Sequence, residues 1–328
     1  MSPSPSDRVT AFIADYADQV AAITPAFDRT NRQGPPPFQD WRDRLAEVAS
    51  RHGVVGFTLD ASSFESPGAH DPQIESVVGE QVSGEVAMVS ARRNKRVGYR
   101  FLEYSLQRSG DDWRISRIRD YRDDPDAPAV DPAKAADALA APSLQAELRP
   151  LGEQDRHDPG SALGPDVVEV GRFSHSGLLA IGDFGDRLAT IVPLARRVAP
   201  GMATAHIVLV DGRCGALRVS LADATPAQWR LADAVGRGYV YGVDAGNLSV
   251  IDAGRAYGLT VRDKEVAWEA FGDREAAMLA AGDEDFGVIA HSGNGDGAYP
   301  AYWGLDEVGE PVQLVVDFGL VPGAPWGR

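Results

Sequence analysis

The chain has very little cysteine and no long apolar run, and both shortages narrow the possible classes of protein. Cys214 is the single cysteine among 328 residues, so an internal disulfide and a cysteine-based zinc cluster are excluded. No apolar run reaches the roughly 18 residues that a membrane-spanning helix needs. The N-terminus lacks a basic region followed by an apolar one, so no signal peptide is expected. These shortages predict a cytoplasmic protein.

Basic residues are also scarce, and the scarcity is concentrated in the second half. The formal net charge is −16, with 16 basic and 19 acidic side chains in residues 1–125 and 16 basic and 29 acidic in the rest. A surface this acidic repels the phosphates of nucleic acids and of anionic lipids. We therefore expect no nucleic acid and no membrane as a partner, whereas a basic protein would be attracted.

The length favours two domains, and the first opens with helical patterns. One helix is expected after Ser6, a candidate N-cap, and Pro25 should discourage its continuation. A second is predicted over 38–52, ended by Gly53. Apolar residues recur at helical spacing in the first of these helices, at Val9, Phe12, Ile13, Tyr16, Val20 and Ile23.

After Gly53 the spacing of the apolar residues changes from the period of a helix to the two-residue period of strands. Alternation predicts strands over 53–60, 74–92, 97–107 and 112–121. Ser109-Gly110-Asp111 is typical of the turn of a hairpin. Helices followed by an antiparallel meander predict an α+β domain over residues 1–125, with the helices packed on one face of a curved, cone-like sheet.

A Pro/Ala/Asp-rich stretch, 126–165, separates this domain from the next and is interpreted as a linker. It carries one helix start, Asp131-Pro132. Residues 166–328 are predicted to form a β-rich domain with peripheral helices, and Asp211-Gly212 predicts a hairpin. The expected strands are 167–173, 177–181, 203–210, 215–221 and 286–290, and the expected helices are 226–235 and 266–281.

The order of elements in residues 7–122 resembles that of nuclear-transport-factor-two-like domains. The stretch YRFLEYSLQRSGDDWRI, 99–115, is similar to the last strands of the immunity-protein versions of that fold. Such proteins are non-enzymatic inhibitors of a toxin made by the same or a neighbouring bacterium, so the resemblance implies a toxin as protein partner, and the cone could hold a small ligand. The open sheet face and the basic run 92–96 are the expected contact surface, which includes Arg93, Arg96, Tyr99, Phe101, Glu103 and Tyr104.

Residues 167–318 resemble a second family, domain-of-unknown-function family 4241. The stretch 292–318 is similar to its C-terminal signature, 241–252 to its central one, and 175–184 to its N-terminal part. Asn294 stands where an aromatic residue is expected, and Phe184 stands where proline is expected. The family has no activity to carry over. The signature positions, expected to be structural, are Gly177, Asp183, Gly201, Asp244, Gly246, Asp252, Gly293, Gly295, Asp296, Gly297, Tyr299, Trp303, Asp306 and Asp317.

The glycine run after His291 is interpreted as a double turn over Ser292–Gly297. It lacks the Lys-Ser/Thr of a phosphate loop and the following helix of a dinucleotide fingerprint. Asn294-Gly295 and Asp296-Gly297 are turn dipeptides. A calcium loop is the alternative, and it would need further carboxylates such as Asp244, Asp252 or Asp306.

Function is left between two classes. The leading hypothesis is a non-enzymatic, immunity-type binding protein without cofactor or metal. The alternative is a hydrolase, with or without a metal ion, that uses Asp244, Asp252, Asp296 and Asp317. A triad built on His175-Ser176 or His291-Ser292 is disfavoured because no nucleophile elbow is present.

Overall fold

The computed structural model describes residues 3–30, 37–94, 100–152 and 166–321. The chain forms two compact units, Met1–Pro125 and Asp126–Arg328, and its class is α+β as predicted. None of the described helices is both long and apolar enough to cross a bilayer.

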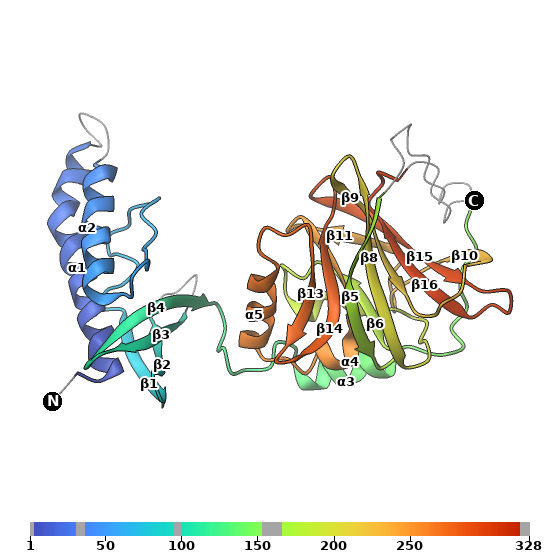
Figure 1. Cartoon of the computed structure of the whole chain (residues 1–328), viewed down its shortest axis with the longest axis horizontal. Helices are drawn as coiled ribbons and strands as arrows, with labels where there is room; N and C mark the ends of the chain where they lie inside the picture. The colour runs from blue at the N-terminus through green and yellow to red at the C-terminus, as the bar shows by residue number, and fades with distance from the viewer. Residues whose placement is uncertain (1–2, 31–36, 95–99, 153–165, 322–328) are drawn as a thin grey trace. The chain divides into compact units, whose positions relative to one another are not determined.

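The first unit packs two helices on a four-stranded antiparallel meander of order β1-β2-β3-β4 (Figure 1). Helix α1 contacts α2, β1, β2 and β4. The predicted apolar stripe of α1 is confirmed, since all six of its residues are buried in the core of this unit. The elements are α1 (Pro5–Thr30), α2 (Phe38–His52), β1 (Glu75–Ser83), β2 (Val86–Arg93), β3 (Phe101–Ser109) and β4 (Asp112–Tyr121).

Helix α1 begins and ends differently from the prediction. Ser4, not Ser6, caps it: the Ser4 hydroxyl accepts the Asp7 N–H at 3.1 Å, and the Asp7 carboxylate accepts the Ser4 N–H at 2.9 Å. Pro25 lies inside the helix. The helix continues beyond it to Thr30, and in this last part the Phe27 ring stacks on Phe64, with ring centroids 3.9 Å apart.

The strand predicted over 53–60 is wrong. Only an isolated bridge joins Gly53 to Ile115, and Gly56 has a φ of +87° that interrupts an extended chain. The predicted strand 74–92 is a hairpin, β1 and β2, which turns at Gly84 with a φ of +60°. The predicted 109–111 turn is confirmed, with Gly110 at a φ of +63°.

The second unit contains two antiparallel sheets. The seven-stranded sheet has the order β10-β15-β16-β9-β8-β5, with β11 also paired to β15, and the five-stranded sheet has the order β13-β14-β12-β6-β7. Strands of the first sheet are β5 (Asp166–His175), β8 (Gly201–Val210), β9 (Arg213–Ser220), β10 (Gln228–Leu231), β11 (Val240–Val243), β15 (Gly297–Leu305) and β16 (Pro311–Asp317). Those of the second are β6 (Leu179–Gly182), β7 (Val192–Pro193), β12 (Asn247–Asp252), β13 (Ala276–Ala281) and β14 (Glu284–His291).

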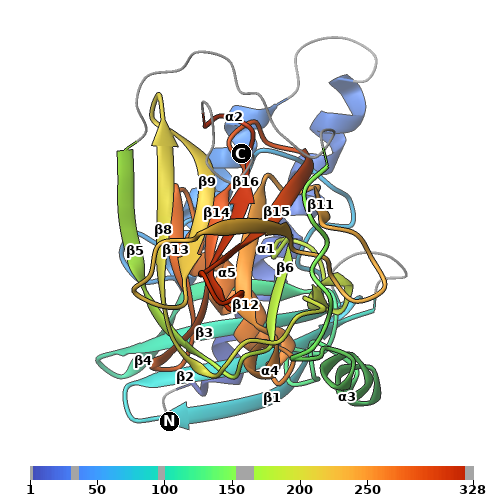
Figure 2. The same ribbon diagram turned by 90° about the vertical axis from the view of Figure 1, so that its right-hand side faces the viewer.

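The two sheets of this unit pack face to face, so their strands overlap in the view of Figure 2, and apolar residues of the helices pack against the other side of the smaller sheet. The inner core joins residues of both sheets, such as Phe173, Val250 and Trp303. A second core lies between the five-stranded sheet and the helices, where Ala135 and Phe271 are buried. The helices are α3 (Pro132–Ala140), α4 (Ala253–Ala256) and α5 (Val261–Phe271).

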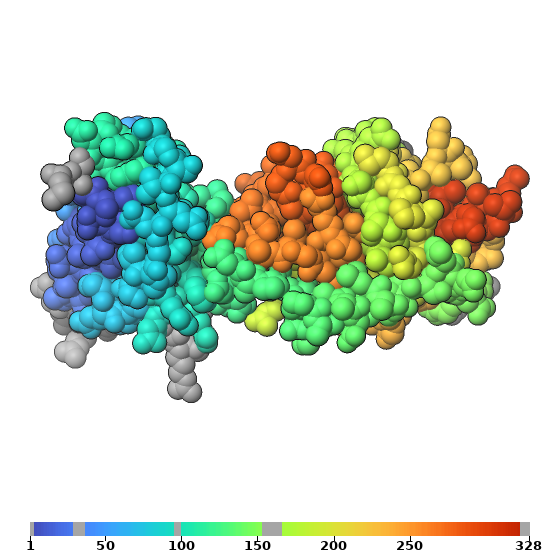
Figure 3. All heavy atoms as spheres, turned by 90° about the horizontal axis from the view of Figure 1, so that it is seen from below, coloured from blue at the N-terminus to red at the C-terminus, as the bar shows by residue number. Residues whose placement is uncertain are grey.

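The predicted linker needs a correction, because its described part, 126–152, belongs to the second unit. Figure 3 shows it in green along the surface of that unit. Val130 is 3% exposed, and the Ala129 N–H donates to the Leu259 carbonyl at 2.9 Å. Small apolar side chains and backbone hydrogen bonds thus fix a segment without aromatic residues. The predicted helix start is confirmed, since the Asp131 carboxylate accepts two backbone N–H groups at the start of α3.

Both helices predicted late in the chain differ from the structure. Segment 226–235 contains strand β10, because Trp229 and Leu231 follow a period of two and pair with β15. Segment 266–281 holds only the end of α5, which stops at Gly272 with a φ of +52°, and then β13. The Asp211-Gly212 hairpin is confirmed, with φ values of 51° and 76°.

Candidate functional site

A largely apolar groove lies in the first unit between α2 and the segment that follows it. Its volume is about 740 Å³, and we call it the α2 groove. Val55, which lines it, is 105% exposed, and Ala46 on α2 is also exposed. Arg42, Ser50, Asp60 and Ser62 supply the polar part of its lining, and Ala46, Ala49, Val54, Val55, Phe57, Leu59 and Ala61 supply the apolar part.

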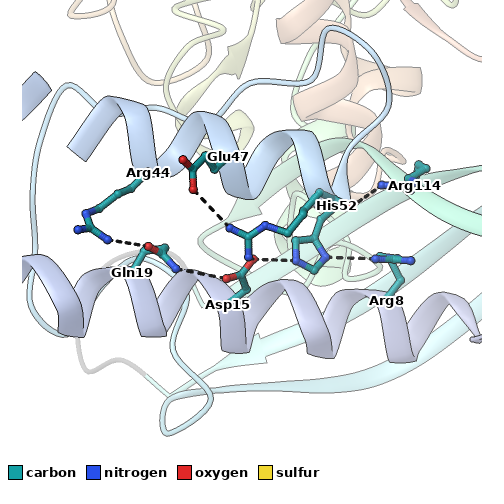
Figure 4. A network of polar contacts seen from close by, with 8 residues as sticks. Arg8, Asp15, Gln19, Arg44, Glu47, His52 and Arg114 are labelled. Atoms are coloured by element: carbon teal, nitrogen blue, oxygen red, sulfur yellow. Dashed lines mark hydrogen bonds and ion pairs between the residues drawn. The ribbon is translucent and has the colours of Figure 1, made fainter. Parts of the chain in front are cut away.

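A polar network holds the groove-bearing helix against α1 (Figure 4). Asp15 of α1 accepts a hydrogen bond from Arg51 at 2.6 Å and lies 3.0 Å from Nε2 of His52. Arg44 donates to Gln19 at 3.0 Å. Burial, which outweighs the nearby Asp15, lowers the pKa of His52. The network fixes the α2 backbone from which Ala46 faces the groove.

Four polar side chains meet inside the core of the same unit, at His70, Glu75, Arg93 and Tyr104. The Glu75 side chain is fully buried and accepts a hydrogen bond from the Tyr104 hydroxyl. His70 Nδ1 lies 3.1 Å from Glu75 and 2.9 Å from the Tyr104 oxygen. The Arg93 guanidinium lies 3.7 Å from Glu75 and 3.5 Å from Asp120. Glu75 thus orients His70 and neutralises Arg93.

Burial, reinforced by the charge of Glu75, raises the pKa of Tyr104 well above its usual value. The hydroxyl therefore keeps its proton and acts as a donor. Phe12 and Tyr16 enclose His70, with ring centroids 4.9 Å and 5.0 Å from the imidazole. A carboxylate and a tyrosine that hold a histidine in apolar surroundings position that ring accurately.

A pocket of about 340 Å³ opens beside His70, and we call it the His70 pocket. Tyr16, Asp120 and Ile118 line it together with His70. It shares Phe57 and other residues of the 57–60 segment with the α2 groove. A small ligand bound in the first domain stays a prediction, and this pocket is a place for it.

The predicted contact face of the sheet needs correction. Arg93 and Tyr104 are 7% and 0% exposed, because they alternate onto the side of the sheet that faces the helices. On the other face, Glu103 is also buried, at 3% exposed, and lies 3.6 Å from Arg119, whereas Arg92 lies over the ring of Phe101. Arg96 and Tyr99 lie outside the described residues.

Asp183 of the second unit joins two signature stretches. Its carboxylate accepts the backbone N–H groups of Asp244 and Ala245 at 2.8 Å and 2.7 Å, and the Asn247 side-chain amide at 3.0 Å. It also accepts the Gly185 N–H at 2.9 Å. The signature turn 243–247 is therefore held by a buried carboxylate that has no capacity left for catalysis.

The carboxylates of the hydrolase alternative do not form one cluster, although Asp244 and Asp296 flank the register pair Val243–Gly297 of β11 and β15. Asp252 accepts a hydrogen bond from Ser176 at 2.5 Å in the five-stranded sheet, whereas Asp317 is buried in the seven-stranded one and accepts the Gly319 N–H at 2.7 Å. Asp296 is exposed, as is Asp244, which lines a cavity of about 210 Å³ with Asp183. Within the described ranges no three His, Cys, Asp or Glu side chains could hold a metal together.

The glycine run forms a turn, but only two of the three glycines expected to have a positive φ have one. Gly293 and Gly295 have φ values of +64° and +88°, and Gly297 already belongs to β15 with no positive φ. Ser292 donates to the Gly295 carbonyl at 2.7 Å, and so does Tyr299 at 2.8 Å. Asp306 accepts the N–H groups of Val308 and Glu310 in the predicted second turn.

The histidine–serine pairs do not form triads. Ser176 donates to Asp252 and Ser292 to a backbone carbonyl, so neither hydroxyl is bound to a histidine. His291 Nδ1 lies 3.4 Å from the Gly246 carbonyl. Burial raises the pKa of the Cys214 thiol, which leaves it unreactive.

Sequence reasoning missed the His70–Glu75 cluster, although it contained one signal for it. Tyr104 alternates with Leu102 and Leu106 in the sequence and so shares their apolar face, where a buried tyrosine hydroxyl needs a partner. The partner could not be named, because His70 lies in an irregular segment and Glu75 begins a strand.

The remaining signature positions pack as structural residues. Tyr299 and Trp303 alternate into the inner core, Gly246 has a φ of +66°, and a Cβ on Gly177 would lie 2.2 Å from the Val198 carbonyl oxygen. Gly201 begins β8. These observations give each of these residues a role in packing or in backbone conformation, and none of them indicates a catalytic role.

Comparison with known proteins gives one match, to a protein family, and it lies in the second unit. No curated protein and no solved structure matches the chain. Residues 193–316 match the model of one family, described as "Protein of unknown function (DUF4241)". That match runs from the end of β7 almost to the end of β16, so this part of the second unit is similar to the proteins of that family. The expected N-terminal part of the resemblance, 175–184, lies outside the match.

Proposed function

We propose that this chain is a non-enzymatic binding protein of the immunity type, which neutralises a cognate toxin by binding it. The α2 groove is the observation that carries this proposal. Its apolar lining, open volume of about 740 Å³ and fully exposed Val55 are typical of a surface that another protein covers.

The charge of the chain indicates the kind of partner. Of the net charge of −16, only −3 falls in residues 1–125 and −13 falls in the rest, so the chain attracts a basic protein mainly through its second unit and speeds the encounter without directing it to the groove. Arg42 and Asp60 give the groove a polar rim that could fix the orientation of a docked segment. The occupant we propose is an apolar segment of a basic toxin.

The hydrolase alternative has weaker support. Asp252 and Asp317 lie in different sheets, and each accepts a hydrogen bond from its own neighbourhood. A second binding candidate is a small ligand in the His70 pocket, favoured by the fixed orientation of His70. A ligand there should raise the melting temperature of the wild type but not of Ala69→Phe, which fills the pocket.

Growth rescue tests the groove. A toxin encoded beside this chain should arrest growth when expressed alone, and co-expression of the wild type should restore growth. Ala46→Arg and Val55→Arg place bulk and positive charge in the groove at exposed positions, so they should abolish rescue and leave the fold intact. Val308→Arg is the matched control, because Val308 is 83% exposed in a turn of the second unit. Full rescue by both groove variants would refute the proposal, as would the absence of any toxic neighbouring product.

A further inference from the structure

A polar hollow of about 530 Å³ lies on the face of the seven-stranded sheet that points away from the inner core. Strands β5, β8, β9 and β16 supply its floor, and residues 221–225 form one wall. On β8, Ala203 and Ala205 belong to the inner core, so Thr204 and His206 project to the opposite face.

The strand register places six polar side chains together on this face. Arg172, Thr204, Ser220 and Gln313 form one row across four strands, because each is the register partner of the next. His206 and Arg218 are register partners two residues further along β8 and β9. Neighbours in such rows have their Cβ atoms about 5 Å apart.

The two arginines of the hollow have no counter-charge in the described ranges. Neither the Arg172 nor the Arg218 guanidinium forms a hydrogen bond or an ion pair there, although the unit is rich in carboxylates. Arg218 Nε and His206 Nδ1 are buried without a hydrogen-bond partner among described residues. The Arg218 Nε–H is a buried donor and needs an acceptor, whereas His206 Nδ1 donates or accepts depending on the tautomer.

The charges around the hollow define what it can accept. Burial, and then the charge of Arg218, lowers the pKa of His206, against the opposing effect of Glu169. Asp223 lines the hollow and forms no ion pair with either arginine in the described part of the chain. The floor therefore presents two fixed positive charges, hydroxyl groups and an amide, with Asp223 at the wall and Glu169, the register partner of His206, on β5.

We infer that this hollow binds a small oxyanion, the phosphoryl or carboxylate group of a ligand, between Arg172 and Arg218. Guanidinium groups bind such oxygens in pairs of parallel hydrogen bonds. The hydroxyls of Thr204 and Ser220 and the amide of Gln313 stand in the same row to donate further bonds. Asp223 would weaken anion binding by like-charge repulsion. The hollow would therefore accept only ligands whose negative group lies away from the wall that carries Asp223.

The test is thermal unfolding of the full chain against inorganic phosphate and, separately, acetate, with sodium chloride holding the ionic strength constant. Phosphate also stabilises proteins generally, because it is excluded from their surfaces. The comparison between variants therefore separates specific binding in the hollow from this general effect. Wild type should show a saturable rise in melting temperature. Arg172→Gln and Arg218→Gln should weaken binding about tenfold each, as expected for the loss of a charged hydrogen bond. Asp223→Asn should strengthen it.

Arg187→Gln is the control, an exposed arginine of the same unit that does not line the hollow. A response to phosphate alone assigns a phosphoryl group, and a response to acetate as well assigns a carboxylate. Arg172 is exposed, so its variant keeps the inference testable if Arg218→Gln fails to fold. An equal rise in wild type, Arg172→Gln and the control, or no saturable rise with either anion, would overturn it.

Discussion

Asp183 is a single buried carboxylate that satisfies three backbone N–H groups and one side-chain amide. Asp183→Ala leaves these donors buried without an acceptor, so it should cost about 3 kcal/mol or more of unfolding free energy. Urea unfolding of the full chain measures the loss. Asp186→Ala is the control, because Asp186 is exposed and should change stability little. Equal effects of the two substitutions would show that Asp183 is not the anchor of its turn.

His175 predicts how stability responds to pH. It is 6% exposed with both ring nitrogens unpartnered in the described structure, and burial lowers its pKa, partly offset by Asp252. The unfolded chain then binds the proton more readily, so stability is full above the ordinary histidine value of about 6.5 and is lost as pH falls below it. Unfolding between pH 7.5 and 5.5 should be less pH-dependent in His175→Phe. An unchanged slope would remove His175 from the account.

The turn before β15 makes a graded prediction for its three glycines. Gly295→Ala should cost about 1–2 kcal/mol, because a Cβ meets open space but the residue keeps a positive φ. Gly293→Ala should cost more, since its Cβ would also lie 2.5 Å from the Cys214 carbonyl oxygen. Gly297→Ala should cost least, because it has no positive φ. Melting temperatures give the order, and any other order contradicts this geometry.

The same turn separates the two interpretations of the glycine run. Asp296→Asn keeps a turn-forming side chain, so it should leave stability almost unchanged. A calcium-dependent rise in melting temperature that Asp296→Asn abolished would favour the metal-loop alternative instead.

Elements whose signal lies within a few neighbouring residues could be predicted from the sequence. Elements that depend on contacts with distant parts of the chain could not. The α1 stripe and the Asp211-Gly212 hairpin carry their signals within a few residues. Strand β10 has the same apolar content as a short helix, and only its pairing with β15 distinguishes them. The described part of the predicted linker has little apolar area of its own, and its position depends on the Leu259 carbonyl far along the chain.

The candidate sites were harder to predict than the elements for the same reason. The α2 groove depends on where 53–62 lies after α2, and that segment has no regular structure. The oxyanion hollow needs the register of four strands, which joins Arg172 to Gln313 across 141 positions of sequence. Neither depends on a motif of adjacent residues.

The chain as a whole divides at Pro125, and the second unit includes what looked like a linker. A fragment of residues 126–328 should unfold cooperatively, whereas 166–328 should be less stable because it lacks α3 and buried Val130. Denaturant unfolding of the two fragments measures the difference. Equal stability would restore the linker interpretation.

The central claim is that a toxin docks in the α2 groove of the first unit. The most direct test is hydrogen exchange of the full chain, alone and in complex with the toxin that growth rescue identifies. We expect slower exchange in 42–62 on binding, and none of this protection with Val55→Arg. A complex that forms with unchanged exchange in 42–62, and with protection confined to the second unit, would contradict the account.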